Sequence, residues 1–444
     1  MTTADLQQDI PVVPSPASGG DPLGVFHHDR LPPWALVRHR LDGTEIDDVD
    51  RAVADAIAPF AGTIRPGVRV CVAVGSRGID RIAEVARAAV AVFRGLGGDV
   101  FAVPAMGSHG GATAEGQLEV LASLGITPET IGCDIRSSME TVQLGTLEPG
   151  VPVFFDRHAF EEADVVVPIN RVKPHTDFSG PVESGLLKMI AIGLGKQRGA
   201  DTFHAEGFAA FAELIPAVGR YTLSKVNIPF GLALLENGLS RLRRIEAVAA
   251  ADIWDREQAL RDEADGYLAR LPIASLDVLV LDRIGKDISG LGMDSNVVGR
   301  YYTGPTGHGP AIQRIVVRDL TDETEGNAVG IGMADVALRR AVDRMDAAKT
   351  YMNCITAKTP EGARIALTVE SDRQAIDVAL SCCIKVEPAA ARIVRILDTK
   401  HLGWFYATEP LLPELLATGR CDVESEVRPI AFDGRGGFTD VLPE

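Results

Sequence analysis

The chain contains few cysteines and no cysteine motif. Its 444 residues include six cysteines, which form neither a CxxC pair nor a regular spacing. This pattern argues against disulfides and cysteine-ligated metal. Cys71 lies in an apolar run typical of a buried strand, and Cys382 and Cys383 lie in another apolar stretch. We therefore predict reduced core thiols, as in a cytosolic protein.

The chain also lacks an excess of positive charge and any long apolar run. Its formal net charge is −17 at pH 7, which would repel nucleic acids and anionic membrane surfaces. No apolar run approaches the length that spans a bilayer, and the first residues show no basic-then-apolar signal. We predict a cytoplasmic protein with neither nucleic acid nor membrane as partner. An anionic substrate would need a local pocket of Arg, Lys or backbone N–H groups.

The common nucleotide-binding motifs are absent as well. No GxGxxG fingerprint follows the first strand-like run, so an ordinary NAD site is unsupported. Gly195 and Lys196 resemble the end of a Walker A loop. However, Ile190 stands where the first glycine belongs, and Gln197 stands where Ser or Thr belongs. We therefore exclude a P-loop at this position.

What the chain does have is a repeated alternation of strand-like and helix-like segments. Runs that are apolar on both faces, separated by helices, predict mainly parallel sheets covered on both sides. The expected strands are 68–74, 99–105, 163–169, 276–282, 312–318, 364–369 and 392–397. The expected helices cover 80–95, 113–124, much of 184–222, 251–269, 335–346 and 372–383.

This length and alternation predict two α/β domains, each with a mainly parallel sheet flanked by helices. Residues 1–22 are rich in proline, serine and glycine and are expected to form a flexible tail. The first domain is predicted over 23–270 and the second over 271–444. Whether the last segment returns to the first domain is left open. The active site is expected in the cleft between the domains.

His109 lies in a glycine-rich turn after a predicted strand, in the stretch GSHGG at 107–111. An imidazole there can exchange protons near pH 7 or bind metal, and small residues let a ligand approach the backbone. A histidine bonded only to its own loop is the structural alternative. Arg77 occupies the corresponding turn after the preceding strand, where it can bind a carboxylate or remain a solvated surface residue. Neighbouring parallel strands would bring Arg77 and His109 to the same sheet edge.

His175 follows a predicted buried strand in the stretch NRVKPH at 170–175. Pro174 biases Lys173 toward extended geometry and stiffens the approach to His175. The segment from Asn170 to Gly180 is mostly polar, which indicates that it faces a cavity. A functional role is therefore favoured for His175.

Lys188 and His204 complete the set of candidate residues. Lys188 is flanked by leucines, isoleucines and a methionine, so burial would lower its pKa and make the amine nucleophilic. The alternative is a lysine whose stem lies along an amphipathic helix. His204 is a possible ligand for nickel, zinc, copper or iron, although one histidine needs further ligands. Its alternative is a helix-surface histidine.

The order of these residues resembles the nickel-pincer-nucleotide-dependent 2-hydroxyacid racemase and epimerase family, the lactate racemase-like proteins. The resemblance covers most of residues 66–210 and extends to the second unit only in architecture. Arg77 follows the first strand, His109 the second and His175 a later one. Lys188, with Gly193 five residues on, matches the family's lysine motif. His204 follows at the family's lysine-to-histidine spacing.

The resemblance implies a function and a role for each residue. The cofactor would be a pyridinium-3,5-bisthiocarboxylic acid mononucleotide nickel complex, attached covalently to Lys188, with His204 as the protein ligand to nickel. His109 and His175 would be the two alternating bases, and Arg77 would bind the carboxylate of a 2-hydroxy acid. Maturation would need cofactor-synthesis enzymes as partners. The oligomeric state is not implied.

Some features depart from the family pattern. Ser76 and Gly78 flank Arg77 where typical members carry Thr and Pro. The stretch from His175 to Lys188 is also longer than expected from lactate racemase. In the second unit, around 285–304, Asp294, Asn296 and Arg300 are the candidate substrate contacts. The identity of the hydroxy acid therefore stays open.

Two other functions are compatible with the same residues. One is a metal-dependent hydrolase or lyase in which His109, His175 and a carboxylate such as Glu183 hold a divalent ion. The other is a binding protein that retains the fold without the chemistry. A binding protein would be expected to have lost at least one key residue, and all of them are present here.

Overall fold

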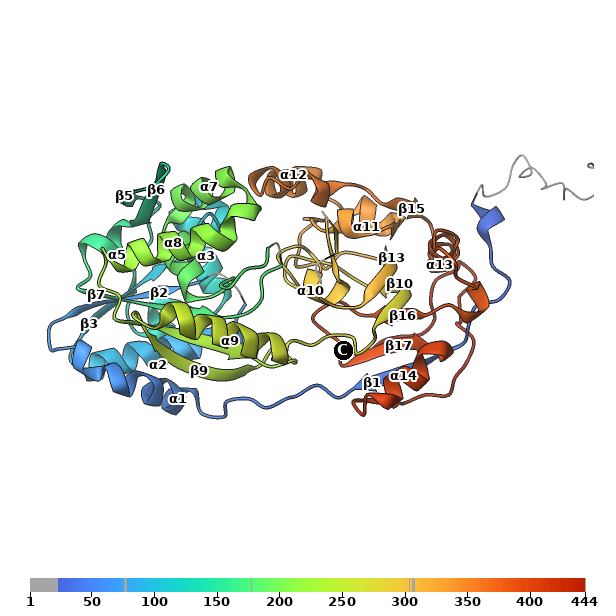
Figure 1. Cartoon of the computed structure of the whole chain (residues 1–444), viewed down its shortest axis with the longest axis horizontal. Coiled ribbons are helices and arrows are strands. Elements are labelled where there is room, and N and C mark those ends of the chain that lie inside the picture. The colour runs from blue at the N-terminus through green and yellow to red at the C-terminus, as the bar shows by residue number, and fades with distance from the viewer. Residues whose placement is uncertain (1–22, 76–77, 177, 303, 306–307, 444) are drawn as a thin grey trace, which may run out of the picture.

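The computed structural model describes residues 23–75, 78–176, 178–302, 304–305 and 308–443. It contains two α/β units that lie side by side along the long axis of the molecule (Figure 1). Each unit is built on one mainly parallel sheet, as the alternation in the sequence predicts. The predicted tail 1–22 lies outside the described residues. No helix among the described residues has the length and apolar character needed to cross a membrane.

The sheet of the first unit has six strands, and every pair is parallel except β8 with β9. Its order is β4 (Asp134–Ile135), β3 (Asp99–Pro104), β2 (Arg69–Val74), β7 (Val165–Arg171), β8 (Phe230–Glu236) and β9 (Leu242–Ala249). The longer helices are α1 (Val49–Ile57), α2 (Ile82–Gly95), α3 (Ala114–Ser123), α7 (Lys196–Glu206), α8 (Phe211–Leu223) and α9 (Ile253–Tyr267). The short helices are α4 (Pro128–Ile131), α5 (Arg157–Glu161) and α6 (Leu186–Lys188), and β5 (Thr141–Leu147) and β6 (Val151–Asp156) form a separate hairpin.

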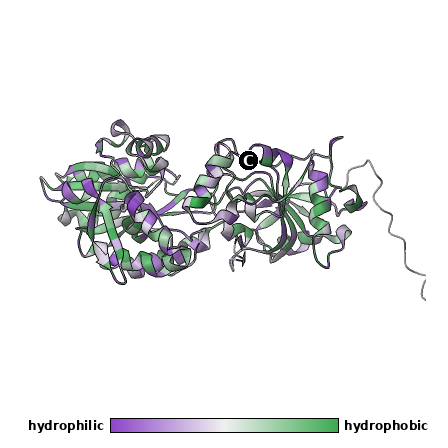
Figure 2. Cartoon of the chain, turned by 90° about the horizontal axis from the view of Figure 1, so that it is seen from above, coloured by the Kyte–Doolittle hydropathy of each residue, from purple (hydrophilic) through white to green (hydrophobic). Residues whose placement is uncertain are grey.

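The packing of strand β2 explains why its sequence is a continuous apolar run. Its even-numbered residues from 70 to 74 pack into the cluster that contains α1 and α2, and Cys71 and Ala73 pack into the cluster beneath α6–α8. Both faces of the strand are therefore buried, as expected for a parallel strand covered by two helical layers. Apolar residues are concentrated in the sheets at the centre of each unit (Figure 2).

The sheet of the second unit has eight strands. Its order is β15 (Leu367–Val369), β14 (Val336–Leu338), β13 (Ala311–Val317), β10 (Ser275–Leu281), β16 (Ile393–Ile396), β17 (Trp404–Thr408), β1 (Trp34–His39) and β18 (Cys421–Val423). The pairs from β15 to β16 are parallel, and the last three are antiparallel. The helices are α10 (Ser295–Val298), α11 (Arg339–Asp343), α12 (Ala347–Thr356), α13 (Asp372–Ser381) and α14 (Leu412–Ala417), and β11 (Arg300–Tyr301) pairs with β12 (Gly304–Pro305).

The position of β1 corrects the predicted boundary of the first domain at residue 23. Strand β1 lies between β17 and β18 in the second sheet, far from the rest of the N-terminal half (Figure 1). Trp34 is fully buried there, stacks on Tyr406 and donates a hydrogen bond to Asp440 Oδ2 at 3.0 Å. The chain then crosses to α1 in the first unit. The C-terminal strand β18 remains in the second sheet, so the last segment does not return to the first domain.

Two helix predictions also need correction. Residues 336–338 form β14 because they pair with both β13 and β15, and only 339–343 are helical. The helical stretch expected over 184–222 is interrupted by a π-helical turn, Met189–Gly193, directly after Lys188. Such turns are rare in proteins, and those that occur are often found at functional sites.

Candidate active site

A cavity of about 440 Å³ lies between the two units. It opens at the carboxyl ends of β2, β3 and β7, the edge where ligands bind in open α/β sheets. His109, His175, Lys188 and His204 all line it. Arg77, the fifth predicted residue, lies outside the described residues, although its neighbours Gly75 and Gly78 line the cavity.

His175 is buried, with 9% of its surface exposed. Its backbone N–H donates to Glu183 Oε2 at 2.5 Å, and its ring lies 4.4 Å from the ring of Phe178. Nε2 of His175 contacts Nζ of Lys188. The backbone of His175, the face of its ring and the Nε2 edge of its ring therefore each have a contact that fixes the side chain.

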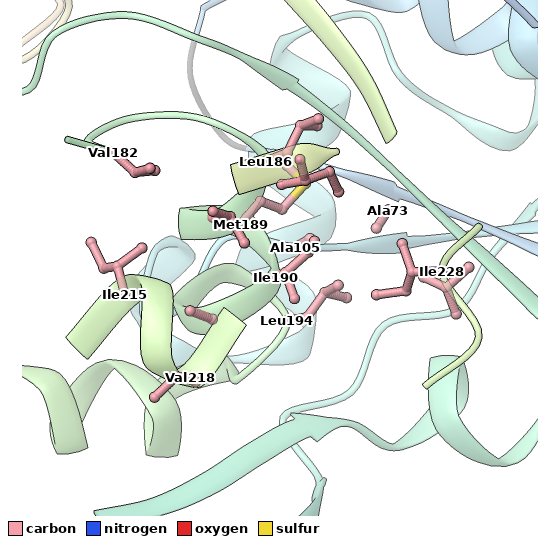
Figure 3. Packing of buried hydrophobic residues seen from close by; sticks show 14 of the residues in the cluster. Ala73, Ala105, Val182, Leu186, Met189, Ile190, Leu194, Ile215, Val218 and Ile228 are labelled. Atoms are coloured by element: carbon pink, nitrogen blue, oxygen red, sulfur yellow. The ribbon is translucent and has the colours of Figure 1, made fainter. Parts of the chain in front are cut away.

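Lys188 ends the three-residue helix α6. The residues around it, including Leu186, Met189 and Ile190, pack into the core beneath the sheet (Figure 3). The turn is also anchored by polar contacts. Asn170 Nδ2 donates to the carbonyl of Gly185 at 2.7 Å, and the N–H of Leu187 donates to Glu257 Oε2 at 3.0 Å. These contacts fix the backbone that carries the lysine amine.

Glu257 is a buried carboxyl that sequence reasoning missed. It belongs to α9, and burial raises its pKa to about 7 although the backbone N–H groups that it accepts act in the opposite direction. A Cβ atom at Gly185 would lie 2.2 Å from Glu257 Oε1, so a larger residue there would displace the Glu257 carboxyl group. No sequence motif identifies Glu257, because in the sequence it looks like the other acidic side chains of the amphipathic helix α9.

His204 lies in the last turn of α7 and is half-buried beside the rings of Phe208 and Phe211. Its Nδ1 atom is buried and has no hydrogen-bond partner among the described residues. Burial lowers its pKa below 6.5, and the nearby charge of Lys188 lowers it further. The imidazole is therefore neutral at pH 7, which is the form that ligates metals.

His109 is exposed and lies in the loop that follows β3. This loop is fixed by contacts with the turn after Lys188. The N–H of Gly107 donates to the carbonyl of Gly193 at 3.0 Å, which joins this loop to the π-helical turn after Lys188. A Cβ atom at Gly193 would lie 2.6 Å from the carbonyl oxygen of Ala105, so the close approach needs glycine. Thr113 caps α3 by accepting the N–H of Gly116.

A buried network supports the loop of His109 from below. Lys196 and Asp156 are both fully buried and form an ion pair at 2.9 Å. The Lys196 amine also donates to the carbonyl of Pro104 at 2.6 Å and to Gln117 Oε1 at 3.2 Å. Gln117 Nε2 in turn donates to the carbonyl of Gly107 at 2.9 Å and reaches that of His109 at 3.3 Å. Lys196 thus has a structural role in this site.

Asp294 and Asn296, two of the candidate substrate contacts in the second unit, line the cavity. Both also approach the loop of His175: Lys173 Nζ lies 3.5 Å from Asp294 Oδ2, and Asn296 Nδ2 donates to the carbonyl of His175 at 3.1 Å. Arg300 does not line the cavity. Its guanidinium bonds to Asp335 at 2.6 Å and to backbone carbonyls of the second unit.

The geometry disfavours the hydrolase or lyase that was the alternative function. Glu183, its candidate carboxylate, already accepts the N–H groups of His175 and Gly180 and contacts Arg261 at 3.2 Å. Among the described residues, moreover, no group of three or more His, Cys, Asp or Glu side chains is arranged to hold a metal ion. A metal held only by protein side chains therefore has no site in that part of the chain.

Comparison with known proteins gives matches among solved structures alone. No family model matches the chain, and no curated protein does. A structural-genomics protein from Thermotoga maritima is 17% identical with a TM-score of 0.47, and the match covers 63% of this chain and 72% of that one. The lactate racemase apoprotein from Thermoanaerobacterium thermosaccharolyticum is 11% identical with a TM-score of 0.47, over 83% of this chain and 99% of that one.

Proposed function

We propose that this protein is a racemase or epimerase of a 2-hydroxy acid and works with a lysine-tethered nickel-pincer nucleotide. One observation carries the proposal. Four side chains whose order in the sequence resembles that family, His109, His175, Lys188 and His204, line one cavity between the units. A structural explanation for each residue taken alone does not account for their convergence.

The residues are chemically suited to such a group. Lys188 places an amine at the cavity wall for covalent attachment, and His204 presents a neutral imidazole with a buried Nδ1 atom that lacks a hydrogen-bond partner among the described residues. Imidazole is a good nickel ligand, and the remaining ligands would come from the cofactor. When bound, the group would supply the acceptance and return of hydride at the substrate carbon.

The other side chains would handle protons and orientation. His109 and His175 would act as the two bases, one taking the hydroxyl proton of one stereoisomer and the other serving the opposite stereoisomer. Glu183 accepts the backbone N–H of His175, and the ring of Phe178 packs against its imidazole. Arg77 is proposed to bind the substrate carboxylate through two hydrogen bonds. The apolar side chains of Met189, Ile192 and Phe211 line part of the cavity and would exclude water there.

Mass spectrometry and metal analysis test the attachment. The protein is co-expressed with enzymes that synthesise the cofactor, and a known family member is loaded in parallel. We expect a mass increment on the peptide that contains Lys188, together with bound nickel. Lys188→Ala should lose the increment, whereas Lys225→Ala, which changes a lysine outside the cavity, should keep it. Unmodified Lys188 beside a loaded family member contradicts the proposal.

A further inference from the structure

Three consecutive residues of the second unit contact the loop that carries His175. Ser295 Oγ donates to the carbonyl of Thr176 at 2.6 Å, and Asn296 Nδ2 donates to the carbonyl of His175 at 3.1 Å. Asp294 Oδ2 lies 3.5 Å from Lys173 Nζ. The first two contacts are buried, because Ser295 is 0% and Asn296 2% exposed. Two main-chain carbonyls of the first unit thus have their hydrogen bonds supplied by the second.

The segment that makes these contacts is anchored in its own unit. Met293, Val297 and Val298 flank the polar residues and are buried in the core of the second unit. The backbone N–H of Asp294 donates to Thr399 Oγ1 at 2.8 Å, and the Asp294 carboxylate accepts the N–H of Asn296 at 2.9 Å. The two donors are therefore carried by a packed element, and their positions move with the second unit as a whole.

The contacts at His175 come from both units. On the amide side, Glu183 of the first unit accepts its N–H, and on the carbonyl side Asn296 of the second unit donates to its oxygen. The ring rests on Phe178 and contacts Lys188, both in the first unit. A backbone held at both ends limits how far the imidazole can rotate or shift. If the second unit is displaced, the carbonyl side loses its buried donor.

We propose that Ser295 and Asn296 are positioning residues that hold His175 from across the domain interface. The imidazole of His175 then keeps the orientation seen here only while the two units are in contact. The arrangement of the units therefore controls the orientation of this ring in the cavity. Calling His175 a base rests on the proposed function. The positioning itself does not, because it concerns the orientation of His175 in the free protein.

Ser295→Ala, Asn296→Ala and the double variant test this proposal in the full chain. Asn227→Ala is the matched control, since Asn227 donates to the carbonyl of Asp164 at 2.7 Å within the first unit and outside the cavity. Histidine ring signals are followed by NMR at one pH, and the signal of His175 is identified by its absence in His175→Ala. Amide exchange is measured over 173–176, where the N–H groups of Lys173 and His175 donate to Ser184 and Glu183.

We expect the ring signal of His175 to shift in the double variant, while the ring signals of His158 and His401 stay where they are in the wild type. Amide exchange over 173–176 should become about tenfold faster, as expected for the loss of a hydrogen bond that held the segment. Where turnover is found, kcat should fall by ~10²-fold with KM nearly unchanged, because a misplaced group slows the chemical step. Asn227→Ala should match the wild type in each measurement.

An unchanged His175 signal and unchanged exchange in a folded double variant would overturn the proposal. The same changes in Asn227→Ala would overturn it too, since they would then reflect general loosening. If the double variant does not fold, Ser295→Ala, which removes a single oxygen atom, decides the question by the same two readouts. These readouts need no cofactor or substrate, so they still test the positioning of His175 if the proposed function fails.

Discussion

The side-chain amine of Lys188 contacts Nε2 of His175, although the two residues are 13 positions apart and belong to different motifs. The contact arises because the chain from β7 turns back on itself. Lys173, just before His175, and Ser184, just before the helix that carries Lys188, form an isolated antiparallel bridge. The proposed attachment point and one proposed base therefore share one corner of the cavity. The effects of substituting Lys188 can be distinguished by experiment from the effects of substituting His175.

The first prediction uses this separation. His175→Ala should lower the racemisation rate by ~10²–10⁴-fold, the usual contribution of a general base. The same variant should still carry the mass increment on Lys188, because the proposed link would form through the lysine amine and not through the imidazole. His109→Ala should behave likewise. Turnover is measured by loss of optical activity from a single enantiomer, and His158→Ala, which lies outside the cavity, is the control. Retained turnover in either variant would reject the two-base assignment.

Much of the fold can be predicted from the sequence because it depends on local patterns. Strands β2, β3 and β7 are continuous apolar runs, and parallel strands buried on both faces require such runs. The meeting of His109 and His175 at one edge follows from the parallel order of their strands. The partner of β1 cannot be predicted in this way. A strand near the N-terminus can pair with any free edge, and here its partners are C-terminal.

The supporting residues of the site were missed for a different reason. Lys196, Gln117 and Glu257 act through buried contacts with backbone groups from other elements. Their residue types are ordinary on helices, so periodicity treats them as surface positions. For Lys196 the sequence does contain a usable signal, because the residue follows Gly193 and Gly195 at the end of a strongly apolar stretch. The burial of Lys196 depends on Asp156, and nothing in the sequence indicates that these two residues lie close together.

Glu257 leads to a second prediction, on the pH dependence of stability. Its pKa of about 7 in the folded protein lies above the ordinary value of 4.5. Between these values the folded state binds the extra proton, so the free energy of unfolding falls as the pH rises through this window and levels off above about 7. Glu257→Gln keeps an acceptor for the N–H of Leu187 and lacks this dependence.

The stability of Glu257→Gln relative to the wild type should therefore rise by about 3 kcal/mol between pH 4.5 and pH 8. Urea unfolding at a series of pH values measures the difference. Glu213→Gln, at an exposed position of α8, should follow the wild type throughout. A constant difference between Glu257→Gln and the wild type across this range would show that Glu257 titrates alike in the folded and unfolded chains.

The buried pair of Lys196 and Asp156 gives a third prediction. Lys196→Met leaves the Asp156 carboxylate buried without its counterion, and should lower the free energy of unfolding by about 3–5 kcal/mol. Adding Asp156→Asn removes that charge and keeps an oxygen for the N–H of Ala159, which Asp156 accepts at 2.8 Å. The double variant should thus be more stable than Lys196→Met alone.

Denaturant unfolding of the two single variants and the double variant measures this coupling, with Lys225→Met as the surface control. Additive effects would mean that the pair does not interact. Amide exchange over 107–110 should also rise in Lys196→Met, because Lys196 holds Gln117 and Gln117 holds the carbonyls of Gly107 and His109. Unchanged exchange there would separate the stability of the pair from the support of the His109 loop.

The fourth prediction concerns His204 and separates attachment from metal binding. His204→Ala removes the proposed nickel ligand and leaves Lys188 in place, so co-expressed protein should keep the mass increment on Lys188 and contain less nickel. Because the proposed cofactor would supply most of the nickel ligands, the nickel of His204→Ala should be lost progressively on dialysis against a chelator, whereas the wild type should retain it. His401→Ala, a histidine outside the cavity that contacts Asp398, is the matched control. Equal nickel retention in His204→Ala and the wild type would show that the imidazole is not a ligand, and that its buried Nδ1 serves the packing of α7 against Phe208 and Phe211.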